Sequence, residues 1–281
     1  MKKIICIILA LTMIVSTPSL CAFAKESVAP TSGTGQTQET KKLAKKKKNG
    51  WVTTDKGKRK YYKNGKLVKS RLIKIKKYYY YFNRYGTLIK GKTLKYKKKT
   101  LYLSNKGRLR VYRKKGKLYF PNGDEMSKAE SEDFECRLSA EKIAADITDG
   151  DMSKSEKLSV CFNWVMKKYY ATHRQSCNVS YWPAVYAKDH FENRNGDCHS
   201  DAAAFAYLAA AIGYKNVYVC NDASYVSPDA HAWAEIDGKV YDPLFAQAKS
   251  YSKNYGVSYS TYKLSPVLRV NLDYNAKRPK K

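Results

Sequence analysis

A pattern of aromatic pairs followed by Asn and Gly recurs between residues 60 and 123. The recurring segments are KYYKNG (60–65), YYFNRYG (80–86), LYLSNKG (101–107) and LYFPNG (118–123). Gly65, Gly86 and Gly107 are each 21 residues apart. Asn and Gly adopt the positive φ angles of a tight hairpin turn, so each unit predicts strand, turn and strand. Hairpins of fixed period that cannot bury their apolar faces alone must stack, which predicts a β-solenoid-like array over residues 49–127.

Helical periodicity replaces this pattern in residues 128–281. Ser153-Lys154-Ser155-Glu156 has the form of a capping box. The apolar residues after it fall on one helix face; they are Leu158, Cys161, Phe162, Val165 and Tyr169. An Ala-rich segment from about Cys198 to Ile212 predicts a second helix, with Gly213 as its C-terminal cap. The segments VYVC, HAWAEI and KVYD follow as predicted strands, so helices and then strands indicate an α+β layer fold.

The first 24 residues have the layout of a secretory signal peptide. Lys2 and Lys3 precede an apolar run, and Ala22-Phe23-Ala24 forms a small-x-small cleavage site. The apolar run is short for a transmembrane helix, so we expect a secreted protein with no membrane insertion after signal removal. The expected order is signal peptide (1–24), disordered basic linker (25–48), hairpin repeats (49–127) and a C-terminal domain (128–281).

Charge divides the chain into two unlike parts. Between Lys41 and Ser127 there are 31 Lys and Arg residues against 3 acids, whereas residues 128–281 hold 20 against 19. Such a field concentrates polyanions on the first part and weakens with added salt. Nucleic acid would fit the charge, but export favours an anionic polymer of the cell surface, so we expect no nucleic-acid partner.

Five of the 7 cysteines lie beyond the signal segment; they are Cys136, Cys161, Cys177, Cys198 and Cys220. An odd number in a secreted protein leaves at least one thiol free or paired with another chain. Either one reactive cysteine with up to two disulfides or five reduced thiols would fit. The chain has no CxxC motif, which argues against a structural zinc site, and we expect neither a metal nor a cofactor.

Three short segments of the C-terminal part combine into a candidate thiol site. They are GDC (196–198), HAW (231–233) and YDP (241–243). Cys198 stands at a predicted helix N-terminus, where the helix dipole lowers the pKa of a thiol and favours the thiolate. A thiolate is a useful acyl-transfer nucleophile when a histidine shares its proton and a third group holds that histidine.

A predicted hairpin with Asp237-Gly238 as its loop supplies this third group. In that register Ala234 faces Tyr241, and Trp233 faces Asp242. Asp242 then shares a sheet face with Trp233 and with His231, at a diagonal distance of about 7 Å. A register slip of one residue would move Asp242 to the other face.

In this order and spacing, GDC, HAW and IDGKVYDP resemble the transglutaminase-like superfamily of papain-like thiol enzymes. The resemblance covers about residues 155–250 and implies an α+β fold with a papain-like, transglutaminase-type core. It implies Cys198 as the nucleophile, His231 as general base and then acid, and Asp242 as the residue that orients His231. In that family the oxyanion is held by the backbone N–H of the cysteine and by an upstream side chain. Trp182, in SYWPAVY, is the candidate for that side chain.

The resemblance implies acyl transfer on peptide or amide bonds of a peptide or protein substrate. Water as acceptor makes the protein a peptidase or amidase, and an amine makes it a protein crosslinker. We expect hydrolysis, because a crosslinker needs a site that excludes water. An inactive domain displayed as a surface-binding module is the alternative. NlpC-type wall peptidases also combine Cys and His, but the Ser-Gly that usually follows their cysteine is absent here.

The spacing of the hairpin units and the opening Gly50-Trp51 resemble the cell-wall-binding repeats of choline-binding and glucan-binding surface proteins. The resemblance covers about residues 49–127 and implies retention at the cell wall. The expected wall-binding aromatics are Trp51, Tyr61, Tyr62, Tyr80, Tyr81, Tyr102, Tyr119 and Phe120. Tyr predominates where that family usually has Trp, and the surrounding Lys would repel a cation such as choline. We expect an anionic or sugar-rich wall polymer instead, with a Lys- and Tyr-rich spacer as the alternative.

The remaining chemistry-bearing residues have structural interpretations. The other four cysteines, Cys136, Cys161, Cys177 and Cys220, are expected to be core residues or disulfide partners. His173 and His190 are expected at the surface, and Trp182 and Trp233 would also fit a hydrophobic core. Neighbouring helix residues face different directions, which argues against a metal site made of Cys198, His199 and His231.

Overall fold

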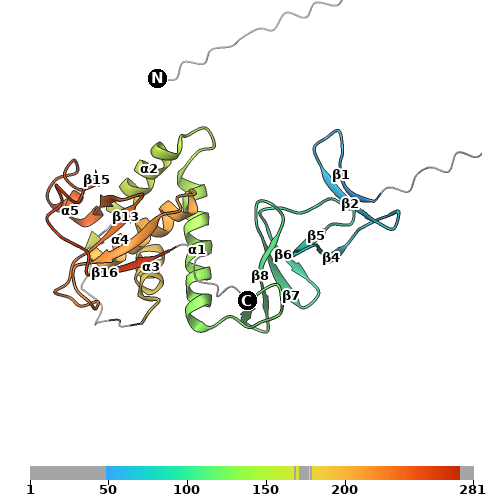
Figure 1. The fold of residues 1–281 in the computed structure, drawn as a ribbon, viewed down its shortest axis with the longest axis horizontal. Coiled ribbons are helices and arrows are strands. Elements are labelled where there is room, and N and C mark those ends of the chain that lie inside the picture. The colour runs from blue at the N-terminus through green and yellow to red at the C-terminus, as the bar shows by residue number, and fades with distance from the viewer. Residues whose placement is uncertain (1–48, 168, 171–176, 178, 273–281) are drawn as a thin grey trace, which may run out of the picture. The chain divides into compact units, whose positions relative to one another are not determined.

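The computed structural model describes residues 49–167, 169–170, 177 and 179–272. These residues belong to one compact unit that begins at Lys48. The predicted signal peptide (1–24), the predicted linker (25–48) and His173 lie outside the described residues. Figure 1 shows hairpins in the first part of the chain, followed by helices and a sheet.

Short antiparallel strands build the first part. They are β1 (Gly50–Thr53), β2 (Arg59–Lys63), β3 (Lys66–Leu67), β4 (Arg71–Ile75), β5 (Tyr78–Phe82), β6 (Thr93–Tyr96), β7 (Lys99–Leu103), β8 (Leu109–Lys114) and β9 (Lys117–Tyr119). They pair in the orders β1-β2-β3, β4-β5 and β6-β7-β8-β9. Asn64 and Gly65 have φ angles of 51° and 75°, the positive values that an Asn-Gly turn requires. The predicted antiparallel hairpins are therefore confirmed.

Each hairpin unit packs against the preceding one through the same position of the 21-residue repeat. A Cβ atom on Gly86 would lie 2.8 Å from the Leu67 side chain, and one on Gly107 would lie 3.0 Å from Leu88. The two leucines are themselves 21 residues apart, like the two glycines. The 21-residue sequence repeat is thus a packing repeat, in which glycine leaves room for the leucine of the preceding unit.

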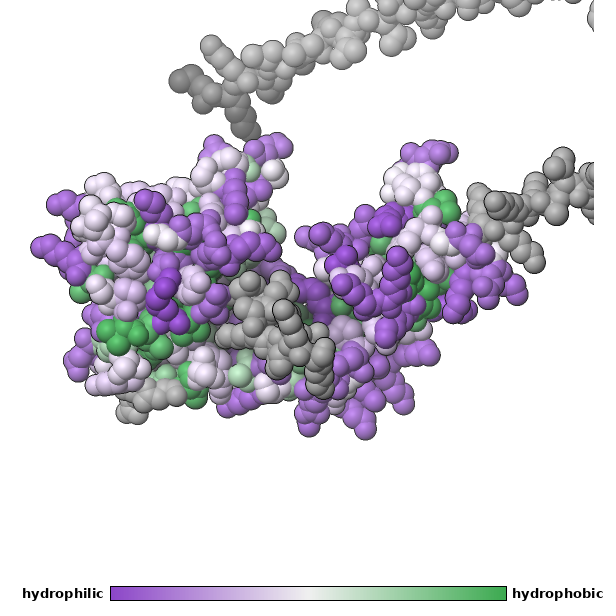
Figure 2. Space-filling view, in the orientation of Figure 1, coloured by the Kyte–Doolittle hydropathy of each residue, from purple (hydrophilic) through white to green (hydrophobic). Residues whose placement is uncertain are grey.

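Small apolar clusters lie between the hairpins, beneath a mostly hydrophilic visible face (Figure 2). One cluster contains Val68, Ile75, Phe82 and Leu88, and another contains Leu101, Leu103, Leu109 and Tyr112. Each cluster draws its residues from more than one unit. Because a single hairpin cannot bury enough apolar surface to be stable, this sharing is what makes the array possible.

Helices and a second set of strands build the C-terminal part. The helices are α1 (Lys128–Ile147), α2 (Lys154–Met166), α3 (Trp182–Asn193), α4 (Cys198–Ala211) and α5 (Pro243–Ala248). The strands are β10 (Tyr169–Tyr170), β11 (Asn195–Gly196), β12 (Val217–Asn221), β13 (Ala232–Ile236), β14 (Lys239–Tyr241), β15 (Tyr255–Val257) and β16 (Leu268–Asn271). Five strands form an antiparallel sheet in the order β15-β14-β13-β12-β16, which confirms the α+β prediction. Within the described residues, no helix combines the length and apolar character needed to cross a bilayer.

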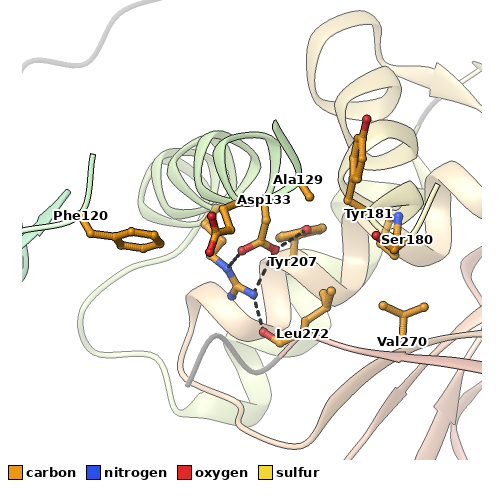
Figure 3. Close-up of a pocket in the computed structure, with 11 residues that line it drawn as sticks. Phe120, Ala129, Asp133, Ser180, Tyr181, Tyr207, Val270 and Leu272 are labelled. Atoms are coloured by element: carbon orange, nitrogen blue, oxygen red, sulfur yellow. Dashed lines mark hydrogen bonds and ion pairs between the residues drawn. The ribbon is translucent and has the colours of Figure 1, made fainter. Parts of the chain in front are cut away.

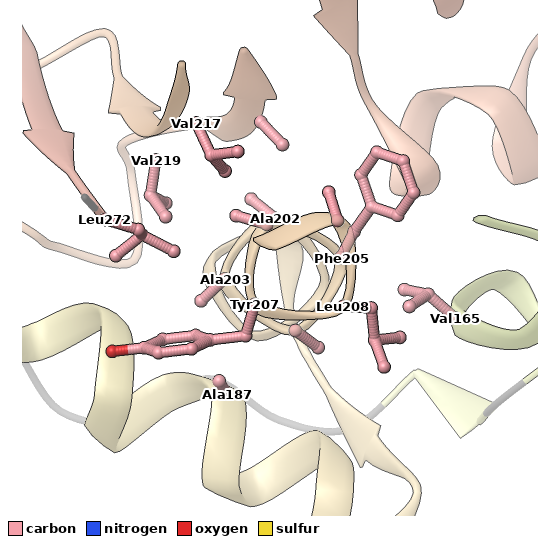
Figure 4. Close-up of a cluster of buried hydrophobic side chains, with 14 of the residues drawn as sticks. Val165, Ala187, Ala202, Ala203, Phe205, Tyr207, Leu208, Val217, Val219 and Leu272 are labelled. Atoms are coloured by element: carbon pink, nitrogen blue, oxygen red, sulfur yellow. The ribbon is translucent and has the colours of Figure 1, made fainter. Parts of the chain in front are cut away.

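Helix α4 lies inside the C-terminal part, and its residues from Cys198 to Ala209 are all buried. Figure 4 views α4 along its axis, with Val217 and Val219 of β12 on one side and Ala187 of α3 and Val165 of α2 on others. Alanine side chains let several elements approach one helix closely, since they add little to its radius. The alanine run is therefore a consequence of burial on every face.

Reciprocal capping boxes start α1 and α2, at Ser127 with Glu130 and at Ser153 with Glu156. The helix predicted from the second box is present, but it ends at Met166. Tyr169 lies in β10, so its predicted place on the helix face is wrong. Tyr169 has the sequence spacing of the apolar face of α2, although the helix ends before it. Apolar spacing alone therefore does not locate the end of a helix.

His190 is fully buried, so the surface position expected for it is wrong. Its Nδ1 lies 3.3 Å from Oδ1 of Asp201, which is also buried, and its Nε2 lies 3.1 Å from Nη1 of Arg194. Pairing of this kind is what makes a buried imidazole tolerable. The partner lies on another helix, and nothing in the local sequence around His190 reveals it.

All five cysteines of the described part are free. Cys136, Cys161 and Cys220 have no exposed surface, and Cys177 is half-buried. Burial raises the pKa of the Cys161 and Cys220 thiols to about 12. Of the two alternatives for these cysteines, the structure has the reduced core residues rather than disulfide partners.

Candidate active site

The GDC segment forms the N-terminus of α4, and each of its three residues has a different role in the local structure. Gly196 has a φ of 142°, and a Cβ atom there would lie 2.3 Å from the Cβ of Ser200. Asp197 is the N-cap, and its Oδ1 accepts hydrogen bonds from the backbone N–H groups of His199 (2.9 Å) and Ser200 (3.1 Å). The cap does not use the N–H of Cys198, which is the first residue of the helix.

The hairpin of β13 and β14 has the predicted register. Ala234 pairs with Tyr241 and Ile236 pairs with Lys239. Asp237 and Gly238 form the turn, with φ angles of 49° and 78°. Asp242 follows β14 directly and is the N-cap of α5.

His231 and Asp242 are in contact across this hairpin. His231 Nε2 lies 2.7 Å from Asp242 Oδ2. The imidazole stacks on the Phe245 ring, with centroids 4.0 Å apart and planes inclined by 15°. The backbone N–H of His231 also donates to Asp222 Oδ1 at 2.7 Å, and the N–H of Asp222 donates to the His231 carbonyl at 3.1 Å. These contacts hold the ring in one orientation.

Asp242 is fully buried and accepts hydrogen bonds from three donors. Its Oδ1 accepts from the N–H of Phe245 (2.9 Å), and its Oδ2 accepts from the hydroxyl of Tyr262 (2.8 Å) as well as from His231. An ionised carboxylate needs a proton on the His231 Nε2 atom facing it. Nδ1 of a neutral His231 is therefore the nitrogen that is left to act as a base.

The sulfur of Cys198 lies against the backbone on either side of His231. Cys198 is 4 % exposed, its Sγ lies 3.7 Å from the Ala230 carbonyl oxygen, and the backbone N–H of Ala232 donates to it. The structure thus brings Cys198 to the segment that carries His231. Between these two described side chains there is no direct hydrogen bond.

Burial raises the pKa of the Cys198 thiol to about 12. The negative charges of Asp197, Asp242 and Asp201 contribute to this rise, and the hydrogen bond from Ala232 opposes it. The thiolate expected from the helix dipole is therefore wrong for this resting state. The position at the N-terminus of α4 is as predicted, but burial and three carboxylates outweigh the favourable end of the helix.

His199 and Asn221 are site neighbours that the sequence motifs do not reveal. His199 Nδ1 lies 3.5 Å from Cys198 Sγ, and the amide nitrogen of Asn221 lies 2.8 Å from His199 Nε2. Asn221 Oδ1 accepts from the N–H of Ala223 at 2.8 Å. The sequence offers only weak indications of these two neighbours. His199 is a polar residue directly after Cys198, and Asn221 is a polar residue at the end of a predicted strand.

The ligand atoms of Asp197, Cys198 and His199 lie within 4.8 Å of one another, which is the spacing of ligands around a single metal ion. Their hydrogen bonds do not fit this role. Asp197 Oδ1 already caps two N–H groups, and His199 Nε2 accepts from Asn221, which puts the ring proton on Nδ1. A protonated Nδ1 cannot bind a metal, so this cluster does not fit a metal ion.

Trp182 is nearly buried, at 3 % exposure, and its ring lies edge-on to His199 at a centroid distance of 5.8 Å. Its indole N–H is buried and has no hydrogen-bond partner among the described residues. His199 lies next to both Trp182 and the Cys198 sulfur. Trp182 also lines a hollow of about 420 Å³, together with Ser224, Tyr225 and Val226.

A second cavity, of about 170 Å³, is shown in Figure 3, and Cys198 is not among the residues that line it. Its polar groups pair among themselves, since Arg137 contacts Asp133 at 2.8 Å and the Tyr207 hydroxyl donates to Asp133 at 2.8 Å. Phe120, one of the aromatics predicted to bind the wall, lines this cavity and is buried with Phe134.

The other predicted wall-binding aromatics are half-buried, and most of them pack against another aromatic ring. Trp51 contacts Tyr61 and Tyr80, at centroid distances of 5.2 and 5.1 Å. Tyr81 contacts Tyr96, Tyr102 contacts Phe134 and Tyr119 stacks on Tyr112. Tyr62 lies in β2, opposite Gly50 and Leu67.

Cationic side chains of the same chain cover many rings of the hairpin units. The pairs are Arg59 over Trp51, Lys74 over Tyr79, Lys77 and Arg108 over Tyr78, Arg84 over Tyr85, Lys97 over Tyr96 and Lys99 over Tyr112. The shortest distance from a cation to a ring centroid among them is 3.7 Å, for Arg108. A ring face covered in this way is not available to a cationic ligand.

Comparison with solved structures finds short similar segments. The choline binding domain of Spr1274 in Streptococcus pneumoniae is 21% identical, with 22% of this chain and 70% of that chain covered and a TM-score of 0.19. The multimodular pneumococcal cell wall endolysin from phage Cp-1, complexed with choline, is 19% identical, with 28% of this chain covered and a TM-score of 0.22. The chain spans about a quarter of that endolysin, 24% of its length.

Comparison at the level of sequence gives one family. No curated protein sequence matches the chain. The family model described as the Transglutaminase-like superfamily matches residues 141–247, a stretch that contains Cys198, His231 and Asp242. Residues 141–247 therefore form a transglutaminase-like domain.

Proposed function

We propose that this protein is a thiol enzyme of the cell surface, in which Cys198, His231 and Asp242 carry out acyl transfer on peptide or amide bonds. The observation that carries the proposal is the 2.7 Å contact of His231 Nε2 with Asp242, in a segment whose backbone holds the sulfur of Cys198. Hydrolysis is the expected outcome, with a peptide or protein substrate.

The first step is transfer of the Cys198 proton to His231 Nδ1. Because the resting thiol is protonated, this transfer accompanies the attack of sulfur on the substrate carbonyl carbon. Asp242 stabilises the imidazolium that forms, as it accepts from Nε2 throughout. The sulfur–carbon bond forms while the carbonyl becomes an oxyanion.

The oxyanion is held by donors that the resting structure leaves unused. Asp197 caps the N–H groups of His199 and Ser200 but not that of Cys198, which is therefore the first donor. The buried indole N–H of Trp182 is proposed as the second donor. An unsatisfied buried donor costs about 1–3 kcal/mol, which gives it a reason to bind an incoming oxygen.

Collapse of the oxyanion expels the amine, which takes the proton from His231, and leaves an acyl group on Cys198. Water then attacks this thioester while His231 accepts its proton, and the thiol returns as the carboxylic acid leaves. An amine in place of water would give a crosslink by the same sequence of steps. The hairpin units would hold the enzyme on an anionic or sugar-rich wall polymer and so raise the local substrate concentration.

Incubation of purified wall material and surface proteins with the enzyme tests this proposal. Mass spectrometry should find new cleaved amide bonds with the wild type and none with Cys198→Ala. New isopeptide links instead of cleavage would assign the amine acceptor. Identical spectra for the two proteins on all substrates would favour the inactive surface-binding module.

A further inference from the structure

We propose that a cationic hollow lined mostly by the hairpin units is a binding site for a phosphodiester polymer of the cell wall. This inference rests on the proposal that residues 49–127 bind a wall polymer, and it names the site and the ligand class. The hollow has a volume of about 900 Å³, and the cations that line it are Lys74, Lys77, Lys106, Arg108 and Arg110 of the hairpin units and Lys215 of the C-terminal part. None of its lining residues is acidic.

Most of these cations have no anionic partner among the described residues. Arg110 pairs with Glu141 at 2.7 Å, whereas no ion pair of the described part involves Lys74, Lys77, Lys106 or Arg108. Lys74, Lys77 and Lys106 are also exposed. A concave surface with one sign of charge focuses the field and attracts an anion from solution. The hollow is thus a concentrated site within a part of the chain that is basic throughout.

The tyrosines of the hollow limit which polyanion it can take. Arg108 and Lys77 lie over the Tyr78 ring, at 3.7 and 5.4 Å from its centroid, and Lys74 lies over Tyr79 at 5.8 Å. Single-stranded nucleic acid gains much of its affinity from bases that stack on free aromatic faces. Here the chain's own cations occupy these faces, so the remaining chemistry is ammonium and guanidinium groups with phosphate oxygens.

Two charge-matched variants test the proposal. The first carries Lys74→Gln, Lys77→Gln and Lys106→Gln in the hollow. The control carries Lys56→Gln, Lys58→Gln and Lys66→Gln, which are exposed and lie outside it. Binding to purified poly(glycerol phosphate) is measured over a range of salt concentrations, with neutral dextran and oligo-dT as comparison ligands.

The hollow variant should bind poly(glycerol phosphate) about tenfold more weakly at low salt, with a salt slope reduced by about two, while the control stays near wild type. An equal loss of affinity in the two variants would mean that the positive charge of the whole surface binds the polymer, and would overturn the proposed site. Tighter binding of oligo-dT than of poly(glycerol phosphate) would assign nucleic acid instead. Failure of the wild type to bind any polymer, in contrast, would remove the wall association itself.

An independent observation near Cys198 supports a second proposal: we infer that His199 is a positioning residue that donates a hydrogen bond to the sulfur and is oriented by Asn221. The N–H of Ala223 donates to Asn221 Oδ1, so the Asn221 amide nitrogen must face His199. That nitrogen donates to Nε2 at 2.8 Å. The His199 proton is therefore on Nδ1, 3.5 Å from Cys198 Sγ.

This donor favours the charge that sulfur acquires when it loses its proton. The proposed role of His199 rests on the proposed function of Cys198, but it can be tested without a substrate. Nitrogen-15 NMR reports directly which imidazole nitrogen of His199 carries the proton. The alkylation rate of Cys198 by iodoacetamide, followed by peptide mass spectrometry, reports the thiolate population.

In the wild type, the NMR signal should show protonated Nδ1. Asn221→Leu removes the amide that fixes this tautomer, so we expect Nε2 to become protonated and Cys198 alkylation to slow about tenfold. Asn216→Leu, at an exposed hydrogen bond elsewhere, should change neither. Protonated Nε2 in the wild type, or a tautomer change with an unaltered alkylation rate, would overturn the role of His199. Loss of hydrolysis alone would bear on the proposed function only.

Discussion

At the scale of single residues, the site combines a well-oriented base with an unreactive resting thiol. Asp242, Phe245 and the Asp222 backbone contact hold His231 in place. The sulfur of Cys198 instead donates to a carbonyl oxygen, in a buried position beside carboxylates. Such a thiol stays protonated until a substrate excludes water and brings sulfur and imidazole together.

The pH dependence of Cys198 alkylation follows from this environment. Its pKa is raised to about 12, so the thiolate is rare at pH 7 and increases about tenfold with each pH unit. We expect the alkylation rate to rise over pH 7–10 without a plateau. Peptide mass spectrometry assigns the label to Cys198. A plateau below pH 8 would instead indicate a thiolate–imidazolium pair at rest.

The hydroxyl of Tyr262 should affect catalysis through Asp242. Tyr262→Phe removes a 2.8 Å hydrogen bond to the oxygen that also holds His231, and we expect kcat to fall about tenfold. Asp242→Asn removes the charge itself and should lower kcat by about 10³–10⁴. Tyr259→Phe is the control, because its hydroxyl contacts Glu235 and Trp233 rather than Asp242. Equal kcat values for the Tyr262 variant and the wild type would contradict this role.

At the scale of elements, glycine spacing determines how the hairpin units stack. Gly107 has a φ of 76° and lies against Leu88 of the preceding unit. Gly116 has a similar φ of 79°, but a Cβ atom there would have no other atom within 4 Å. Gly116 is therefore required only by its positive φ angle, whereas Gly107 is required both by its φ angle and by the close approach of Leu88.

Alanine substitutions at these two positions should differ in their effect on the free energy of unfolding. Gly116→Ala carries only the strain of a positive φ, about 1 kcal/mol. Gly107→Ala adds an overlap with Leu88, and we expect about 1 kcal/mol more. Urea unfolding followed by tyrosine fluorescence measures both. Equal losses of stability would show that the units do not depend on this contact.

At the scale of the whole described unit, α1 joins the hairpin units to the transglutaminase-like domain. Phe134 of α1 is buried with Val111, Leu118, Phe120 and Met126 from the hairpin side. Ion pairs Arg110–Glu141 (2.7 Å) and Arg113–Glu135 (2.6 Å) lie along the same contact. These interactions give a reason for the two parts to fold together, although the domain boundary predicted at residue 128 remains a prediction.

Removal of Phe134 should uncouple the two parts. We expect one cooperative thermal transition for the wild-type protein and two for Phe134→Ala, with a loss of about 3–4 kcal/mol at the contact. Calorimetry measures the number of transitions. Glu141→Gln removes only a partly exposed ion pair, worth about 0–1 kcal/mol, and should keep a single transition. Two transitions in the wild type would mean that the contact is too weak to couple the parts.

The sequence by itself determined the features that depend on local patterns. The Asn-Gly turns, the capping box at Ser153, the helix after Gly196-Asp197 and the register of the Asp237-Gly238 hairpin all follow from short-range backbone chemistry. The side of the sheet on which Asp242 meets His231 follows from that register. Local rules suffice there because each feature depends on residues close in the chain.

Only the tertiary structure decided what surrounds these features. The raised pKa of Cys198 comes first from burial in the packed domain, and Asp242, which lies on another element, adds to the effect of Asp197 and Asp201, which are close in the chain. The pairing of His190 with Asp201, the Asn221–His199 contact and the position of Arg108 over the Tyr78 ring likewise join residues whose neighbourhood no local pattern encodes. Desolvation and long-range contacts exist only after the chain has packed, which is why the chemical state of the site could not be predicted with its position.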